Sequence, residues 1–384
     1  MGIGDKFQVD EIISKFKVGD DDFDYKPFGS GHINDTFLVF DNQHGEADEA
    51  TQRKYLLQRI NHEVFRDVDG LMRNMNLVTT RLQSELGKSE EMDFTTVRII
   101  PAHDDKLYYL DSWGNYWRMQ TFIPNSTTYD RVTSEKQAFE AGYAFGKFQL
   151  LLENIDVNSL KETIPDFHNM EYRFKNFEAA LQKDAVSRKA SVEKEILFAL
   201  ARQEEMENLY EQVKNVKVPI RITHNDTKFN NVLLDKHTHK AICVIDLDTV
   251  MPGVIWYDFG DSIRTIVNTA DEDEVDLAKI EVDINFFEAF TQGYLQETAL
   301  LLTELEVNQL AFSSRYMTFI MGLRFLTDYL SGDVYYKTKH EHQNLQRARA
   351  QFKLVSQMER KSNEMEEIVL KTYHHFTDHS VSSE

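Results

Sequence analysis

The sequence predicts an α+β protein in two parts, a small antiparallel β-sheet with one helix followed by a larger, mostly helical part. Short aromatic and β-branched runs fill residues 23–124, as is typical of strands. Longer segments with apolar residues at three- and four-residue spacing dominate the rest of the chain. A length of 384 residues with 41% hydrophobic composition is enough for two or three domains or one bilobed unit.

The first part is expected to hold most of the strands. Two short runs around a Gly-Ser-Gly turn predict a β-hairpin over residues 25–40, and residues 55–60 form a further run of strand length. Helical spacing follows from Val68 to Val78. Shorter strand-like runs cover residues 97–100, 107–110 and 116–122, and the composition changes at residues 123–125. We therefore predict two domains, residues 1–123 and 124–384.

The second part is expected to be helical with one interruption. Ser134-x-x-Gln137 is a capping-box start for a helix. Further helices are predicted over residues 191–213, twice between 281 and 331, and over 341–376. Between them, residues 220–223, 231–234 and 241–245 predict three short strands, the last two joined by a polar turn.

Composition argues against several classes of partner. A net charge of −21 repels polyanions and anionic lipid, so we expect neither nucleic acid nor a membrane as partner. No apolar run reaches the length of a membrane span, and the first residues lack the pattern of a secretory signal. The single cysteine, Cys243, fits a reducing compartment. We expect a cytoplasmic protein, and the sequence does not indicate its oligomeric state.

One group of polar residues carries chemistry. His224-Asn225-Asp226 is followed after four residues by Asn231, and Asp246 ends the next predicted hairpin strand. Phosphoryl transfer needs a carboxylate that orients the attacking hydroxyl and oxygen ligands for Mg²⁺. Asp226 fits the first role, and Asn231 and Asp246 fit the second. On the alternative interpretation, Asp226 caps a turn and Asn231 bonds a loop backbone.

The glycine-containing hairpin adds to this interpretation. Gly29, Ser30 and Gly31 let backbone amides approach phosphate oxygens closely. An ordinary hairpin turn also explains such a sequence. Its place before the Asp226 motif favours a phosphate-binding role.

The order of these motifs resembles the aminoglycoside phosphotransferase and choline kinase group, which are relatives of the protein kinases. Within that group, six blocks are similar to the N-acetylhexosamine 1-kinases: GSGHINDTF, LLQRIN, THNDTKFNNVLLD, VIDLDTVMPG, YDFGDSIR and RFLTDYLSGDVYY. The resemblance covers about residues 20–350 and is most specific after residue 220. It implies a bilobed protein-kinase-like fold, with ATP and Mg²⁺ bound.

The resemblance also implies roles at the nucleotide. Asp226 would be the catalytic base, Asn231 and Asp246 the magnesium ligands, and Gly29, Ser30 and Gly31 the phosphate cover. Protein kinases place a lysine on the third strand, whereas this chain has Arg59 there. Arg59 would replace that lysine, with Glu63 or Asp67 as its possible partner. Asp248 stands where protein kinases have a glycine. It would either add charge near the metal or bond the backbone of the 251–253 turn.

For the acceptor, the resemblance implies that Arg324 and Tyr335 contact a sugar. Asp261 and Arg264 are either weaker candidates or a buried ion pair. His32 could reach a ligand from the hairpin, although a solvated histidine is the simpler interpretation. The implied reaction is transfer of the γ-phosphoryl group of ATP to the anomeric hydroxyl of N-acetylglucosamine or N-acetylgalactosamine.

Two alternatives stay open at this point. The acceptor could be choline, an amino alcohol, an aminoglycoside or a thiosugar, because the net charge of −21 would suit a cation. Arg324 argues instead for a neutral or oxygen-rich ligand. The chain could also be a nucleotide-binding scaffold without activity, but Asp226, Asn231 and Asp246 are all present.

Overall fold

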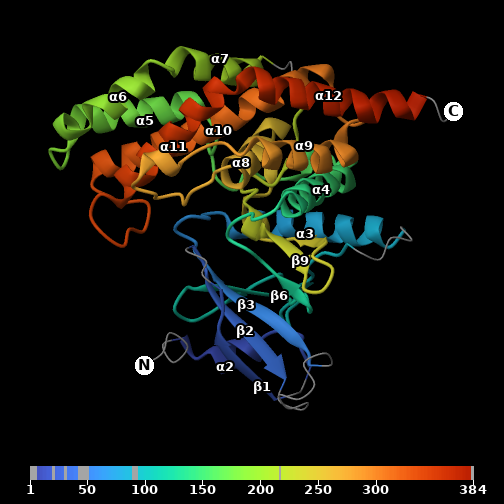
Figure 1. The fold of residues 1–384 in the computed structure, drawn as a ribbon. Helices are drawn as coiled ribbons and strands as arrows, with labels where there is room; N and C mark the ends of the chain where they lie inside the picture. Colours follow the sequence, from blue (N-terminus) through green and yellow to red (C-terminus); the bar gives the residue numbers. More distant parts are fainter. Residues whose placement is uncertain are drawn as a thin grey trace. The chain divides into compact units, whose positions relative to one another are not determined.

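The computed structural model describes residues 7–19, 22–29, 33–41, 52–88, 94–215 and 218–381. It divides into two compact units (Figure 1). The first, the sheet unit, contains residues 1–127, 154–164 and 233–251, and the second, the helical unit, contains residues 128–153, 165–232 and 252–384. These units are grouped by spatial contact. The predicted domain boundary between residues 123 and 124 rests on the change of composition along the chain, and it stays a prediction.

The sheet unit is built on a six-stranded antiparallel sheet in the order β1-β2-β3-β6-β4, with β5 also paired to β6. The predicted hairpin is confirmed, because β1 pairs antiparallel with β2. The helix predicted from Val68 is also confirmed. The elements are α2 (Val9–Ile13), β1 (Phe23–Pro27), β2 (Asp35–Asp41), β3 (Lys54–Ile60), α3 (Val68–Leu86), β4 (Ile99–Ile100), β5 (Tyr109–Leu110) and β6 (Tyr116–Thr121).

One face of this sheet carries an apolar core. Phe37, Leu57 and Trp117 lie on this face of β2, β3 and β6, and they pack with the apolar side chains of α2. The short helix α2, which our sequence analysis did not predict, therefore covers this face. Since side chains alternate across a strand, Thr36, Gln58 and Arg118 lie on the opposite face.

A second, three-stranded sheet has the order β10-β9-β7. It consists of β7 (Ser126–Thr127), β9 (Val232–Asp235) and β10 (Ala241–Val244), and it is followed by a 3₁₀ turn, η4 (Leu247–Thr249), and by β11 (Met251–Gly253). Hydrogen bonds tie it to the rest of the sheet unit: the Thr95 amide donates to the Ile242 carbonyl at 2.7 Å, and Lys236 N–H donates to Asn125 at 2.9 Å. The predicted hairpin over residues 231–245 is confirmed.

The helical unit is a bundle in which α4 lies along α9, and α10 packs against α8, α11, α5 and α12 (Figure 1). Its elements are α4 (Glu135–Leu152), α5 (Met170–Lys183), α6 (Glu193–Leu200), α7 (Gln203–Lys214), β8 (Arg221–Thr223), α8 (Ile255–Ile266), α9 (Ile284–Thr298), α10 (Glu304–Ser331), α11 (Gln343–Arg360) and α12 (Ser362–Val381). Glycines allow α4 and α9 to approach: a Cβ on Gly142 would meet the Phe290 carbonyl oxygen at 2.1 Å, and one on Gly293 would meet that of Phe139 at 2.1 Å.

Two predicted helices are each two helices in the structure. The segment 191–213 divides into α6 and α7, because the Arg202 amide bonds the carbonyl of Ala199 three residues back instead of continuing the α-helical ladder. The segment 341–376 divides at Lys361, whose backbone lies at φ −105° and ψ 10°. The predicted start of α4 is confirmed in part. Ser134 accepts the Gln137 amide, but the Gln137 side chain bonds Thr133.

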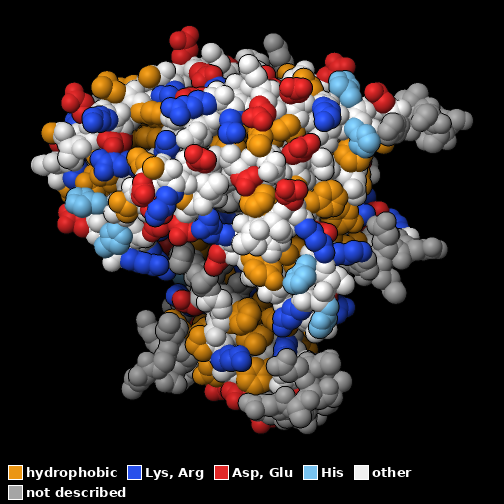
Figure 2. Space-filling model, in the orientation of Figure 1, with side chains coloured by type: hydrophobic (Ala, Val, Ile, Leu, Met, Phe, Trp, Pro, Cys, Tyr) orange, Lys and Arg blue, Asp and Glu red, His pale blue; other side chains and the backbone are white. Residues whose placement is uncertain are grey.

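Charged side chains of both signs are interspersed over the visible face of the helical unit (Figure 2). In this view the excess of acidic residues is not gathered into one patch. No helix within the described ranges has both the length and the hydropathy that crossing a bilayer requires.

Candidate functional site

The Asp226 motif forms a loop between β8 and β9 in which the predicted residues contact each other. Lys228 Nζ lies 2.7 Å from Asp226 Oδ1. Asn231 Nδ2 donates to the Asp226 backbone carbonyl at 2.8 Å and to Oδ2 at 3.3 Å. Both carboxylate oxygens of Asp226 therefore have a donor, and its side chain is 24% exposed. The structure brings Asp226 and Asn231 together, and the bond from Asn231 to the loop backbone is the one that the alternative interpretation described.

A buried carboxylate from α8 holds this loop in place. Asp258 accepts hydrogen bonds from the backbone amides of His224 at 2.8 Å and Asn225 at 2.7 Å, and from the Gln149 side chain at 2.7 Å. Asn225 has a left-handed backbone with φ 64°, a conformation that asparagine adopts more readily than most residues with a side chain. Such a conformation persists when its surroundings over-determine it, and Asp258 supplies that constraint.

The electrostatic surroundings keep Asp226 ionised. Burial alone would raise the pKa of the Asp226 carboxyl, but the Lys228 ammonium opposes this, and His224 and Arg264 add smaller effects of the same sign. The net result is a lowered pKa. In turn, burial would lower the pKa of Lys228, whereas the charge of Asp226 raises it overall. The pair is therefore carboxylate and ammonium at neutral pH.

Asp246 and Asp248 follow β10 in the sheet unit and have different surroundings. Asp246 is exposed and has a left-handed backbone, with φ 62° and ψ 58°. Asp248 is buried, and its carboxylate bonds Arg118 and the Asn34 amide instead of the backbone of the 251–253 turn. Asp248 therefore adds its charge to a buried ion pair.

Taken one residue at a time, the side-chain oxygens of Asn231 and Asp246 are of the kind that suits magnesium. Because the amide nitrogen of Asn231 donates to Asp226, its Oδ1 is the atom left to meet a cation, and Asp246 is an exposed carboxylate. Among the described residues, no group of three or more His, Cys, Asp or Glu side chains is arranged to hold a metal. Magnesium does not require one, since it is usually held by one or two protein oxygens together with substrate phosphates and water.

The predicted nucleotide contacts are described only in part. Gly29 follows β1 with φ +76°, a conformation that favours glycine. Ser30, Gly31 and His32 lie outside the described residues. Arg59 pairs with Asp35, its cross-strand neighbour on β2, through Nε at 2.8 Å. The partner is therefore neither Glu63 nor Asp67, because the register of β2 and β3 places Asp35 opposite Arg59.

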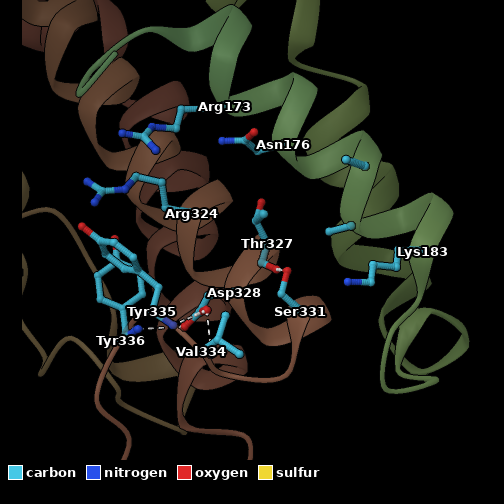
Figure 3. Close-up of a pocket in the computed structure, with 12 residues that line it drawn as sticks. Arg173, Asn176, Lys183, Arg324, Thr327, Asp328, Ser331, Val334, Tyr335 and Tyr336 are labelled. Atoms are coloured by element: carbon cyan, nitrogen blue, oxygen red, sulfur yellow. Dashed lines mark hydrogen bonds between the residues drawn. The ribbon is translucent and has the colours of Figure 1, made fainter. Parts of the chain in front are cut away.

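The predicted sugar contacts, Arg324 and Tyr335, line one pocket of about 370 Å³ in the helical unit (Figure 3). The pocket lies between α5, α10 and the segment after α10. Asp328 shapes that segment, because its carboxylate accepts the backbone amides of residues 334, 335 and 336 at 2.8–3.0 Å. The remaining lining residues are Arg173, Asn176, Ala179, Ala180, Lys183, Thr327, Ser331, Val334 and Tyr336.

This pocket has an excess of positive charge, because its lining contains Arg173, Arg324 and Lys183 but one carboxylate, Asp328. Within the part of the chain that the structure describes, Arg173 and Arg324 form no ion pair with a carboxylate, and Arg173 Nε is buried without a hydrogen-bond partner. Burial and the neighbouring Arg324 lower the pKa of Arg173 to about 10. Both guanidinium groups contact Phe167. That of Arg324 lies 5.2 Å from the centroid of the Phe167 ring, and that of Arg173 donates a hydrogen bond to the Phe167 carbonyl at 2.6 Å.

A histidine links this pocket to the Asp226 loop within the helical unit. His168 follows Phe167, and its Nε2 lies 3.3 Å from the carbonyl oxygen of Asn225. Burial and then the charges of Arg324 and Arg173 lower the pKa of His168 well below its ordinary value. A neutral His168 therefore donates to the residue preceding Asp226. This contact places the pocket beside the loop.

Sequence reasoning missed several residues of these arrangements. Lys228 could have been found from its place two residues after Asp226. Asp258, Arg173 and Arg118 come from distant segments and have no local signal. The alternative that Asp261 and Arg264 form a buried ion pair is confirmed, with Arg264 Nη2 2.8 Å from Asp261 Oδ1.

Comparison with known proteins gives a consistent result. The model of the phosphotransferase enzyme family matches residues 24–300. A microcompartment-associated aminopropanol kinase has a similar structure, with a TM-score of 0.60 and 15% identity over 93% of this chain and 98% of that chain. Choline kinase from Cryptosporidium parvum gives 0.58 and 12% over 96% and 99%. A spectinomycin phosphotransferase, solved with ADP and spectinomycin, gives 0.52 and 13% over 95% and 97%. At these identities the likeness concerns the fold, and the predicted α+β, protein-kinase-like class is confirmed.

Proposed function

This chain belongs to the phosphotransferase enzyme family, and from that premise we propose that it transfers the γ-phosphoryl group of ATP to the anomeric hydroxyl of an N-acetylhexosamine. Residues 1–123 would serve as the nucleotide-binding lobe, and residues 124–384 would carry the Asp226 loop and the sugar pocket. Gly29, Ser30, Gly31 and Arg59 would contact the nucleotide. Asn231 and Asp246 would hold Mg²⁺, which when bound neutralises charge on the phosphate oxygens.

Asp226 would act mainly by positioning the acceptor. Its carboxylate would accept the hydrogen of the anomeric hydroxyl while that oxygen bonds the γ-phosphorus, and the bond to the leaving ADP breaks. The ring oxygen makes an anomeric hydroxyl more acidic than the other sugar hydroxyls, so little basicity is needed. This agrees with the lowered pKa of Asp226, which makes it a weak base that stays ionised. Alignment and charge stabilisation would then supply most of the rate gain.

The charge of the pocket is the observation that supports the choice of acceptor. Arg324 and Tyr335, the proposed sugar contacts, line a pocket whose two guanidinium groups have no carboxylate partner among the described residues. A cationic acceptor such as choline, an amino alcohol or an aminoglycoside would be repelled there. Sugar hydroxyl and acetamide oxygens accept hydrogen bonds from guanidinium groups, and sugar faces pack on aromatic rings such as Tyr335.

The decisive experiment is phosphorus NMR of the product formed from ATP and a panel of acceptors. We expect a sugar 1-phosphate from N-acetylglucosamine or N-acetylgalactosamine, and no product from choline, aminopropanol or kanamycin. Product only from the amines would overturn the acceptor, and a phosphate on another sugar carbon would overturn the anomeric assignment. No turnover of any acceptor, together with ATP binding, would favour the inactive scaffold.

The role of Asp226 has its own test. Asp226→Asn keeps the shape of the side chain and the bond to Asn231, but it removes the negative charge. We expect kcat to fall at least ~100-fold, the usual size of general-base effects, while Mg-ATP binding changes little. Near-normal turnover in this variant would show that Asp226 is not the base.

A further inference from the structure

Arg118 and Asp248 form a buried ion pair on the polar face of the main sheet. Their side chains are 2% and 4% exposed, and Arg118 Nη1 contacts Asp248 Oδ1. The other carboxylate oxygen of Asp248 accepts Asn34 Nδ2 at 2.7 Å. Asn34 is fixed in turn, because its Oδ1 accepts the Asn61 amide at 3.0 Å. Both oxygens of Asp248 are therefore occupied by donors from the sheet unit.

A row of side chains across three strands holds Arg118 itself. Thr36 on β2, Gln58 on β3 and Arg118 on β6 stand opposite each other in register. Arg118 Nε donates to Gln58 Oε1 at 2.9 Å, and Gln58 Nε2 donates to Thr36 Oγ1 at 3.1 Å. In this row the Arg118 guanidinium and the Gln58 amide nitrogen donate, and the Gln58 amide oxygen and the Thr36 hydroxyl accept. The guanidinium therefore has a defined orientation where it meets Asp248.

The backbone that Asp248 belongs to is the turn that presents Asp246. Asp246 is exposed and has a left-handed backbone, a conformation that aspartate adopts more readily than most residues with a side chain. The turn is held two residues on, at Asp248, and four residues on, where the Val250 carbonyl accepts Asn74 Nδ2 at 3.0 Å. The turn is thus anchored on its C-terminal side by the sheet and by α3.

We propose that Arg118 is a positioning residue, which acts through Asp248 to fix the turn that aims the Asp246 carboxylate at the metal of the bound nucleotide. The inference rests on the proposed function, because it takes Asp246 as the metal ligand. It differs from the simpler idea that Asp248 is a second metal ligand. The Asp248 carboxylate is only 4% exposed and each of its oxygens already accepts a bond from Arg118 or Asn34, so it is poorly presented to a metal unless Arg118 moves away.

These two ideas predict opposite signs for one substitution. Arg118→Met removes the guanidinium and leaves the Asp248 charge unpaired, so the turn should relax. We expect the affinity for Mn²⁺, measured by electron paramagnetic resonance on the full chain with ADP, to fall at least ~10-fold, as when other supporting partners of metal ligands are removed. Tighter Mn²⁺ binding would overturn the proposal, since it would mean that a freed Asp248 joins the metal. Unchanged binding would overturn it as well.

Two further variants keep the test decisive if Arg118→Met does not fold. Asp248→Asn preserves the shape of the side chain and an oxygen for Arg118, and we expect Mn²⁺ affinity to change less than ~10-fold. A larger loss would assign Asp248 to the metal and contradict the proposal. The double variant Arg118→Met with Asp248→Asn removes both charges, and we expect it to bind Mn²⁺ better than Arg118→Met alone. Equal affinity would argue against coupling through Asp248.

Arg53, which directly precedes β3 and is 44% exposed, provides a control in the same unit. Its Nε lies 3.2 Å from a carboxylate oxygen of Asp41, whose side chain is fully buried. Asp41 is the last residue of β2, and Asp35 is the first. Arg53→Met should lower the melting temperature and leave Mn²⁺ binding unchanged. If Arg53→Met lost as much Mn²⁺ affinity as Arg118→Met, the loss in Arg118→Met would be explained by general destabilisation and the proposal would be overturned.

The proposal and the proposed function can fail separately. Asp246→Asn should weaken Mn²⁺ binding at least as much as Arg118→Met. If Asp246→Asn has no effect, the metal assignment in the proposed function is wrong. If Asp246→Asn weakens binding and Arg118→Met does not, only the positioning role of Arg118 is wrong.

Discussion

Arg118 in the sheet unit is buried, and Arg173 and Arg324 in the helical unit are half-buried, but the charges of these arginines are balanced differently. Arg118 meets the Asp248 carboxylate and the Gln58 amide oxygen. Arg173 and Arg324 face a pocket, and within the described residues neither has a carboxylate within ion-pair distance. A buried charge is costly unless it is paired. The first arrangement therefore supports structure, whereas the second is better explained by a ligand that supplies the missing oxygens.

The largest expected difference is in the free energy of unfolding after Arg118 or Arg324 is replaced. Arg118→Met leaves Asp248 as an uncompensated buried charge, so we expect the free energy of unfolding of the sheet unit to fall by about 3–5 kcal/mol. Arg324→Met leaves no such charge and should cost far less. Urea denaturation followed by circular dichroism checks both variants. Similar losses in the two would remove the distinction between them.

For recognition of the acceptor, we expect Arg324 to matter, because it lines the pocket. Removing a charge-assisted hydrogen bond costs about 1.5–3 kcal/mol, so Arg324→Met should lower kcat/KM for the sugar by about 10–100-fold. Lys183 is an exposed cation at the rim of the same pocket and is a suitable control. Lys183→Met should stay within about threefold of the wild type, because exposed charges contribute little. A smaller effect of Arg324→Met than of Lys183→Met would contradict the assignment of the pocket.

A third cation, Lys228, is paired like Arg118 but lies in the proposed active site. Its ammonium is the main effect that lowers the pKa of Asp226 against burial, so Lys228→Met should raise that pKa. Because the ionised carboxylate is the active form, the acid limb of the pH–kcat profile should move to higher pH, by about one unit or more. Lys214→Met, which breaks exposed pairs with Glu171 and Glu211, should leave the limb in place.

The smallest effect is expected at Arg173. Burial and the neighbouring Arg324 disfavour its charge, and they lower its pKa to about 10. Arg173→Met should therefore raise the free energy of unfolding of the unliganded protein, by up to about 1 kcal/mol because the residue is partly exposed. Differential scanning calorimetry without acceptor measures this change. A clear loss of stability would mean that Arg173 contributes to the fold, as Arg118 does.

Sequence reasoning located features that depend on neighbours along the chain. The helical spacing of α3 and the local contact between Asp226 and Asn231 are both short-range properties. The ion pair between Arg118 and Asp248 could not be predicted in this way, because the two residues are 130 positions apart in the sequence. The partner of Arg59 depends on the register between β2 and β3, which no local pattern specifies. The breaks at Arg202 and Lys361 were missed because helical periodicity continues across them.

The division of the sheet unit into three stretches, residues 1–127, 154–164 and 233–251, has a consequence for biosynthesis. Strand β7 pairs with β9, which lies about a hundred residues later. On the ribosome, the first stretch must wait while α4 to α7 emerge before its second sheet can close. Because unpaired strand edges in nascent chains promote aggregation, this interval is where we expect chaperones to engage the protein.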